Sequence, residues 1–327
     1  MANARKPLVS VICLCHNHGP YVRESLESVC QQTYPDIELI IVDDASTDNS
    51  PEEIERFVKQ HPGTQYVALL RNLGNCRAFN RGLALASGKY VIDLAADDIL
   101  LPQRVEQQVA AMEELGPSYG VVFSDAEMID EAGNKLKTYY ARNAQGELMV
   151  TVPSGRVYKE LVKKAFICTP TMMIRKALLD ELGGYDESLS YEDYDFWVRS
   201  GRNYLYFFQD KILTQKRVLP HSHGQSFYKE KFNRHLVSTL KVCHKAYQLN
   251  RSPEEHQALA VSVRYHMRQA FYVRQYSLVE EYLALLKKID SLHFPDHVFL
   301  ILSRCEVPVT PLYRWYLKMI RTWSFSS

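Results

Sequence analysis

The sequence lacks the features of a disulfide scaffold, a zinc site or a secreted chain. Its seven cysteines are an odd number and include no C-x-x-C pair, so neither a disulfide framework nor a zinc knuckle is predicted. Residues 1–6 are polar, and the apolar run that follows stops before His16, which is not the pattern of a signal peptide. We therefore expect reduced cysteines and a cytoplasmic protein.

Long hydrophobic runs and a strong net charge are also missing. No segment approaches the roughly 18 apolar residues of a membrane-spanning helix, and the formal net charge is only +1. Residues 1–225 contain 24 Lys+Arg and 30 Asp+Glu, whereas residues 226–327 contain 15 and 8. The acidic first part argues against a nucleic-acid partner, and the basic last third suits an anionic acceptor, lipid head groups or plain solvation.

What the sequence does contain, from Leu8 onward, is an alternation of short apolar runs and amphipathic segments of helix length. This pattern is typical of strands and crossover helices in an α/β sheet. Strands are expected at 9–15, 37–42, 66–70, 90–96 and 121–124, helices at 21–32, from about 51 and at 77–86, and a hairpin turn at 130–134. Nearly continuous apolar strands such as 37–42 are those buried on both faces of a parallel sheet.

Strand signals stop near residue 226, and the remainder reads as helices, including 254–271 and 278–289. The expected organisation is one α/β domain over residues 1–228 and an α-helical region over residues 229–327.

Two aspartate pairs follow predicted strands at the points where those strands end. Asp43 and Asp44 follow the second strand, and Asp97 and Asp98 follow the fourth. Open α/β sheets bind ligands at the carboxyl ends of their strands, so the two pairs are expected to share one ligand-binding rim. Taken alone, the second pair could instead cap a helix near Pro102.

Five motifs occur in order along residues 8–200: V-S-V-I-C-L-C-H-N, I-I-V-D-D-A-S-T-D-N-S, R-N-L-G-N-C-R-A-F-N-R-G, A-A-D-D and G-G-Y-D-E-S-L-S-Y-E-D-Y-D-F-W. In this order and spacing they resemble the inverting family-two glycosyltransferases. The resemblance implies a GT-A fold, which is a Rossmann-like, mostly parallel sheet with flanking helices, and transfer of a sugar from a nucleotide-sugar donor to an acceptor hydroxyl.

The resemblance also implies a divalent cation, Mg²⁺ or Mn²⁺, because a nucleoside diphosphate carries several negative charges and carboxylates hold such ions. It assigns the metal to Asp98 and places Asp97 near the metal or the ribose. The family often has L-D-x-D-D here, whereas this chain has Leu94-Ala95-Ala96-Asp97-Asp98. An upstream carboxylate is therefore missing from the pattern.

Further roles in donor binding follow from the same resemblance. Asp44, with Asp43 as its neighbour, would read the base, since a carboxylate can accept the imide N–H of uracil. Arg77 and Asn80 match an R-x-x-N segment that contacts the donor or supports its site, although they could also be ordinary exposed helix residues. A loop carrying Lys216, Arg217 and His223 would close over the diphosphate, with His223 in contact or simply in solvent.

Catalysis is assigned by resemblance to the E-D-x-D-x-W element. Inversion in one displacement needs a base that takes the proton of the acceptor hydroxyl. Asp193 matches that position, and Glu192 would support it or bind the acceptor.

The tail, residues 312–323, is amphipathic when placed on a helix. Leu312, Trp315, Tyr316, Met319, Ile320 and Trp323 share one side, opposite Arg314, Lys318 and Arg321. Such a helix suits peripheral contact with the inner face of a membrane, or packing on the chain's own catalytic domain.

The sequence thus predicts an inverting, metal-dependent glycosyltransferase that uses a UDP-sugar and a carbohydrate or lipid-linked acceptor, in synthesis of surface polysaccharide or glycoconjugate. A binding module that keeps the fold without activity is the alternative. A sugar nucleotidyltransferase would need a glycine-rich loop with a basic residue near the amino terminus, where residues 15–21 offer only Gly19.

Overall fold

The computed structural model describes residues 6–219 and 233–308. The chain divides into two compact units: residues up to 158 together with 166–219, and residues 159–165 together with the chain beyond 219. The boundary expected between residues 228 and 229 lies outside the described residues, so it stays a prediction.

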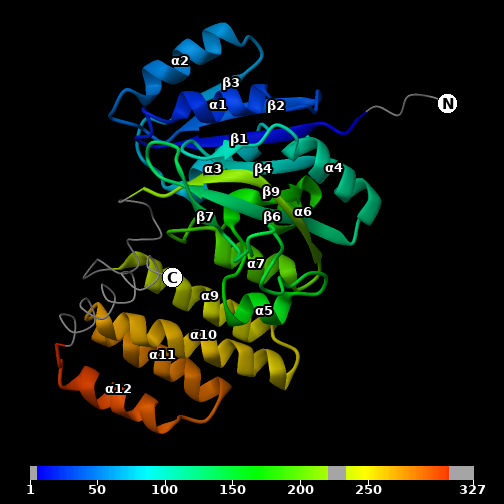
Figure 1. Cartoon of the computed structure of the whole chain (residues 1–327). Coiled ribbons are helices and arrows are strands. Elements are labelled where there is room, and N and C mark those ends of the chain that lie inside the picture. Colours follow the sequence, from blue (N-terminus) through cyan, green and yellow to red (C-terminus); the bar gives the residue numbers. More distant parts are fainter. Residues whose placement is uncertain (1–5, 220–232, 309–327) are drawn as a thin grey trace. The chain divides into compact units, whose positions relative to one another are not determined.

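The first unit is built on a nine-stranded sheet with the order β3-β2-β1-β4-β8-β6-β9-β5, and β7 pairs with β6 (Figure 1). The strands are β1 (Val9–Cys15), β2 (Ile37–Asp43), β3 (Gln65–Ala68), β4 (Tyr90–Ala95), β5 (Ile99–Leu100), β6 (Tyr119–Ile129), β7 (Lys135–Thr138), β8 (Met173–Arg175) and β9 (Leu205–Arg217). Strands β3, β2, β1, β4, β6 and β9 share one direction, and the others run against them. The expectation of a mostly parallel α/β sheet is confirmed.

Helices cover both faces of the β1 region. The helices of this unit are α1 (Val22–Cys30), α2 (Ser50–Gln60), α3 (Asn75–Leu83), α4 (Arg104–Leu115), α6 (Lys176–Leu182) and α7 (Asp193–Gly201), with a short 3₁₀ turn at Thr169–Thr171. Apolar side chains of α1, α2 and α4 join one core with alternate residues of β1. On the opposite face α3 approaches so closely that a Cβ at Gly82 would lie 2.5 Å from Ile12 Cγ2. Strand β1 is consequently buried throughout.

The register of the central strands brings the two aspartate pairs to one edge. Strand β1 pairs in parallel with both β2 and β4, and it places Cys15 opposite Asp43 and Leu14 opposite Ala95. The Asp44 N–H then donates to Cys15 O at 2.8 Å. Asp44 and Asp97 therefore follow the two parallel strands that flank β1, at their carboxyl ends.

Strand β9 is the main element that differs from expectation, because Lys216 and Arg217 lie within it and were expected in a loop. The strand begins with an apolar run at 205–208, but residues 209–211 and 214–217 are polar. It pairs with β6 along its length and meets only the two residues of β5 on its other side. Its second half therefore lacks the continuous apolar run that marked β1 and β2.

The second unit is helical in its described part. It contains α5 (Tyr158–Lys163), whose first residue belongs to the other unit, α9 (Arg234–Leu249), α10 (Pro253–Tyr272), α11 (Tyr276–Ile289) and α12 (Phe294–Arg304). The helices expected at 254–271 and 278–289 match α10 and α11. Arg264 of α10 donates to Asp290 and Asp296, which joins α10 to the start of α12.

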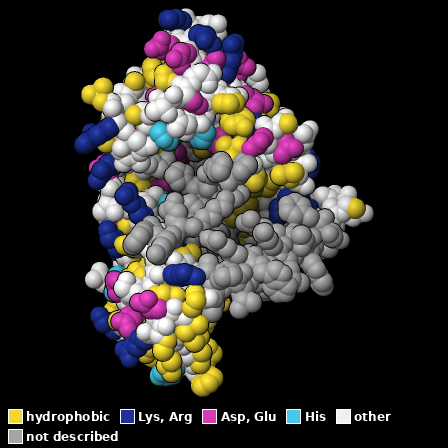
Figure 2. Space-filling model, turned by 90° about the vertical axis from the view of Figure 1, so that its left-hand side faces the viewer, with side chains coloured by type: hydrophobic (Ala, Val, Ile, Leu, Met, Phe, Trp, Pro, Cys, Tyr) yellow, Lys and Arg dark blue, Asp and Glu magenta, His cyan; other side chains and the backbone are white. Residues whose placement is uncertain are grey.

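Helix α12 leaves apolar side chains in solvent: Phe294 is 81% exposed and Ile301 is 61% exposed. Figure 2 shows hydrophobic side chains gathered at the lower end of the view, over the C-terminal helices. None of the helices formed by residues 6–219 and 233–308 combines the length and the apolar character needed to cross a bilayer.

Candidate active site

Four carboxylates from β4, the turn after it and the start of α7 form a cluster near the rim of the sheet. They are Asp93, Asp98, Glu192 and Asp193. Burial is the largest cause that raises the pKa of Asp93 and of Asp193. The charge of Glu192 raises both pKa values further, and the charge of Asp98 also raises that of Asp93. We call this group the carboxylate cluster. Asp93 and Asp193 thus have a raised proton affinity beside other carboxylates, which a bound cation would relieve.

Asp98 lies in the turn between β4 and β5 and is 3% exposed. Its Oδ1 accepts the backbone N–H of Arg217 at 2.9 Å. Burial, with the neighbouring Asp97 charge added, raises the pKa of Asp98 to about 8, against the opposing effects of Lys216 and the Arg217 N–H. Its second oxygen, Oδ2, accepts no hydrogen bond from any residue in the described ranges.

These features fit a cation that is shared with a substrate. Within residues 6–219 and 233–308, no three His, Cys, Asp or Glu side chains are arranged to hold a metal ion on their own. Mg²⁺ typically takes one or two carboxylates and completes its shell with waters and substrate phosphates. The free oxygen of Asp98, with Asp97 beside it, suits that kind of partial site.

Arg217 fixes the turn that carries Asp97 and Asp98. Its side chain is almost fully buried and lies over the Tyr21 ring at 4.7 Å. Its guanidinium donates to Asp97 O (3.1 Å), Asp130 O (3.1 Å), Glu131 O (3.0 Å) and Glu24 Oε2 (2.6 Å). Arg217 therefore joins three separate segments around the rim.

We expect Arg217→Met to lower the free energy of unfolding by about 2–4 kcal/mol, because three carbonyl oxygens and one carboxylate lose a buried donor. Urea denaturation measures this change. Arg23→Met is the matched control, since Arg23 makes only an exposed ion pair with Glu27 and should cost under about 0.5 kcal/mol. Equal losses in the two variants would contradict the organising role of Arg217.

Glu192 and Asp193 stand at the start of α7. Asp193 Oδ2 accepts from Thr169 Oγ1 at 3.2 Å, and Oδ1 accepts the Tyr194 N–H at 2.6 Å. Burial and the Glu192 charge raise the pKa of Asp193 to about 7. Burial also raises the pKa of Glu192, whose Oε2 accepts from Asn75 Nδ2 at 2.5 Å. A carboxyl group with a pKa near neutrality is suited to proton transfer.

Asp43 and Asp44 are buried at the end of β2, and each already has partners. Asp44 accepts the backbone N–H groups of Leu73 and Gly74 at 2.6 and 2.8 Å, so it holds the loop before α3. Asp43 accepts from Ser46 Oγ at 2.5 Å. Each carboxylate has further lone pairs, so these bonds leave room for a ligand.

Arg77 and Asn80 lie on α3 and contact the segment before α7. Asn80 exchanges hydrogen bonds with the backbone of Tyr185, at 2.9 Å in both directions. Arg77 pairs with Glu187 at 3.6 Å, with both side chains about half exposed. The structure thus places the two residues in support of the loop that leads to Glu192. His223 and the amphipathic tail 312–323 lie outside the described residues.

Sequence reasoning did not single out Asp93 or Asn75 as part of the site. Asp93 accepts from the Tyr185 hydroxyl at 3.1 Å. It is two residues before Ala95 on β4, so its side chain shares the strand face on which the family's upstream carboxylate would lie. A single acidic residue inside an apolar strand is the signal that could have identified it.

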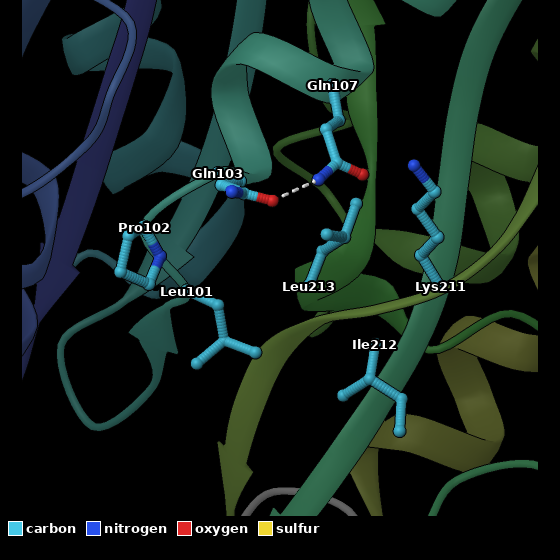
Figure 3. A pocket seen from close by; sticks show the side chains of 7 residues that line it. All are labelled: Leu101, Pro102, Gln103, Gln107, Lys211, Ile212 and Leu213. Carbon is cyan, nitrogen blue, oxygen red and sulfur yellow. Dashed lines mark hydrogen bonds between the residues drawn. The ribbon is translucent and has the colours of Figure 1, made fainter. Parts of the chain in front are cut away.

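A separate pocket of about 570 Å³ lies where β5 pairs with β9 (Figure 3). It is lined by Leu101, Pro102, Gln103, Gln107, Lys211, Ile212 and Leu213. The Gln107 amide donates to Gln103 Oε1 at 2.7 Å, as the dashed line shows. The pocket contains no carboxylate and none of the residues of the carboxylate cluster.

A comparison with protein families gives one match, to the model described as glycosyl transferase family 2, over residues 10–183. This match spans more than half of the chain. The chain belongs to glycosyl transferase family 2. The family-two prediction made from the five motifs is therefore confirmed.

Curated glycosyltransferases match between about half and two thirds of the chain. An uncharacterised glycosyltransferase of Methanocaldococcus jannaschii is 34% identical over 221 residues, 65% of this chain and 71% of that protein. One of Rickettsia prowazekii is 28% identical over 218 residues, 66% of this chain and 65% of that protein. TuaG of Bacillus subtilis, a glycosyltransferase named for teichuronic acid biosynthesis, is 30% identical over 169 residues, 52% of this chain and 62% of that protein.

Solved glycosyltransferase structures share the fold. S. aureus TarS 1–349 in complex with UDP-GlcNAc has a TM-score of 0.67 and 18% identity, covering 94% of this chain and 92% of that chain. The mannosyltransferase PcManGT of Pyrobaculum calidifontis, in complex with GDP-Man and Mn²⁺, has a TM-score of 0.57 and 18% identity, covering 93% and 86%. The expected GT-A fold is confirmed.

Proposed function

We propose that this family-two glycosyltransferase is metal-dependent and inverting, and that it transfers a sugar from a UDP-sugar to an acceptor hydroxyl. The observation that supports this proposal is the series of buried carboxylates in which Asp98 and Glu192 act on Asp93, and Glu192 acts on Asp193. Asp98 offers a free oxygen at the rim, where a donor diphosphate would lie. Asp193 has a pKa near neutrality and lies on α7, away from the turn that carries Asp98. It could therefore stand opposite the leaving group, where the base is needed.

In the proposed reaction the acceptor oxygen attacks the anomeric carbon as the bond from that carbon to the diphosphate oxygen breaks. The proton of the acceptor hydroxyl passes to Asp193, and the nucleoside diphosphate leaves with the bonding electron pair. Thr169 and the Tyr194 N–H hold the Asp193 carboxylate in place. Glu192, which accepts a hydrogen bond from Asn75, would hold the start of α7 in place or bind the acceptor.

Asp98 and Asp97 are the residues that would hold Mg²⁺ or Mn²⁺. When bound, such a cation neutralises charge that develops on the leaving diphosphate. The Mn²⁺ present in the PcManGT complex supports this assignment. His223, Arg77 and Asn80 remain proposed supports of the donor site.

The nature of the donor and acceptor rests on related proteins. TarS binds UDP and UDP-GlcNAc, and PcManGT binds GDP-Man, so relatives of this fold use different nucleotides. We propose UDP because Asp44 offers acceptor oxygens at the end of β2. The name of TuaG supports a carbohydrate acceptor in polysaccharide synthesis. A lipid-linked acceptor, a cytoplasmic location and membrane contact through residues 312–323 stay predictions.

We expect Asp44→Ala to weaken binding of UDP about 10-fold more than binding of GDP, because the lost carboxylate would accept the imide N–H of uracil. Calorimetry with both nucleotides measures the difference. Asp48→Ala is the matched control, since Asp48 also accepts backbone N–H groups in the neighbouring loop, from Gly19 and Ser50. Equal losses for UDP and GDP would remove the base-reading role of Asp44.

The class of reaction is tested with the purified chain and a panel of nucleotide sugars, scored by release of nucleoside diphosphate with Mn²⁺ or with a chelator. Metal-dependent release from a UDP-sugar is the expected result. Binding of a glycan without release from any donor would instead favour the inactive binding module.

A further inference from the structure

Arg104, the first residue of α4, is a fully buried cation that forms no ion pair with a carboxylate in the described part of the chain. Its guanidinium donates instead to Gln108 Oε1 (3.2 Å), Thr214 Oγ1 (2.9 Å) and Met172 O (3.1 Å). Three uncharged partners compensate poorly for the desolvation of a cation, and an apolar side chain could fill the same space. The burial of Arg104 therefore favours a role beyond stability.

Gln108, one turn further along α4, contacts the same backbone segment as Arg104. It is also fully buried, and its Nε2 donates to Thr171 O at 2.7 Å. Arg104 and Gln108 therefore hold two consecutive carbonyl groups, those of Thr171 and Met172, where the 3₁₀ turn ends.

This turn, Thr169–Thr171, supports the residue proposed as the base. Thr169 Oγ1 donates to Asp193 Oδ2 at 3.2 Å. The Met172 N–H donates to Thr169 O at 3.2 Å, and Met172 Sδ accepts from Trp197 Nε1 at 3.2 Å. The segment thus contacts α7 at its first residue and again one turn later. A shift of its carbonyl groups would displace the Thr169 hydroxyl as well.

We infer that Arg104 and Gln108 are positioning residues for glycosyl transfer, because they hold the turn whose Thr169 hydroxyl fixes the Asp193 carboxylate. The inference rests on the proposed function, since it needs Asp193 as the base. Neither residue touches the substrates; both act through the backbone of residues 169–172.

The Thr169 hydroxyl also affects the protonation of Asp193. Burial and the Glu192 charge raise the pKa of Asp193, whereas hydrogen bonds from the Tyr194 N–H and the Thr169 hydroxyl, and the Lys216 charge, lower it. A turn that no longer presents the hydroxyl should leave Asp193 with a higher pKa, so the rise of kcat/KM with pH should move to higher pH. A loss of stability alone would not move this rise.

The test measures kcat, the pH profile of kcat/KM, UDP affinity and Tm on the full chain. Gln108→Met removes the donor to Thr171 O, and Arg104→Lys removes the fork of donors; both keep the net charge. We expect kcat to fall about 10- to 100-fold, as for a catalytic group displaced by about 1 Å. The rise should move to higher pH by about one unit, the effect of one hydrogen bond to a charged group. UDP affinity should be unchanged.

Arg175→Lys is the matched control for Arg104→Lys. Arg175 also donates to backbone carbonyl groups, those of Met112, Gly116 and Tyr119, but these lie at the other end of α4 and just beyond it. Its substitution should lower Tm and leave kcat and the pH profile as in the wild type.

Thr169→Val distinguishes this inference from the proposed function. It removes the hydroxyl itself, so it should reproduce the shift in the pH profile. The double variant with Gln108→Met should then be no slower than the slower single variant, because both act through one contact. If Asp193 is not the base, Asp193→Asn keeps the rise and Thr169→Val leaves the profile unchanged.

Other results would overturn the inference while the proposed function stands. One is a shift in Thr169→Val without a shift in Gln108→Met or Arg104→Lys, which would leave the two residues a structural role. Another is a double variant in which the two losses multiply, which would show that Gln108 acts independently of Thr169. If Gln108→Met does not fold, the same outcomes are decided on Arg104→Lys.

Discussion

Asp193→Asn is expected to lower kcat by about 10²- to 10⁴-fold, the usual contribution of a positioned general base. The amide keeps the shape of the side chain and can still accept from Thr169 Oγ1, but it cannot take up the acceptor proton. UDP affinity should change less than about threefold, because donor binding is assigned to the rim that carries Asp98. Single-turnover kinetics and calorimetry on one preparation measure both quantities.

The pH dependence of the wild-type chain gives a second measurement of the same base. Asp193 must be ionised to act, and its pKa is about 7, so kcat/KM should rise with pH up to about 7 and level off above it. The residual activity of Asp193→Asn should lack this rise. Glu192→Gln is the comparison variant: it should keep the rise but move it to lower pH, because the Glu192 charge that raises the pKa of Asp193 is lost. The base would be Glu192 if that variant lost the rise and Asp193→Asn kept it.

The central strands could be predicted because their sequences carry local signals. Strand β1 and strand β2 are continuous apolar runs that are buried on both faces, and the aspartates that follow β2 and β4 mark their carboxyl ends. Parallel pairing of β1 with both neighbours then brings the pairs to one rim. The five motifs added the roles of Asp98 and Asp193, which spacing alone does not assign.

The rest of the site depends on contacts between distant segments, and no local pattern encodes them. Arg217 and Asp98 are 119 positions apart, and Asn75 and Glu192 are 117 apart. Strand β9 was missed because two blocks of polar residues, 209–211 and 214–217, interrupt its apolar pattern near the edge of the sheet. Lys216 was consequently placed in a loop, and its position beside the carboxylate cluster became visible only from the pairing of β9 with β6.

Asp98→Asn should remove most of the gain in UDP affinity that Mn²⁺ provides to the wild-type chain, a loss of roughly 100-fold or more in the presence of metal. The amide oxygen can still accept the Arg217 N–H, so the turn keeps its anchor while the anionic metal ligand is lost. UDP binding in EDTA should be nearly unchanged. Asp97→Asn, at the second proposed ligand, should have a smaller effect.

Thermal unfolding without nucleotide tests the same assignment through the linkage of stability to protonation. The pKa of Asp98 is raised to about 8 in the folded chain, above roughly 3.9 for an unfolded aspartate, so its contribution to stability is full below about pH 4 and is lost as pH rises to about 8. Asparagine does not ionise, so Asp98→Asn does not lose stability over this pH range. Without metal at pH 8 its Tm should therefore exceed that of the wild-type chain by a few degrees, and Mn²⁺ should raise the Tm of the wild type alone. A Tm of Asp98→Asn that still rises with Mn²⁺ would place the cation on other ligands.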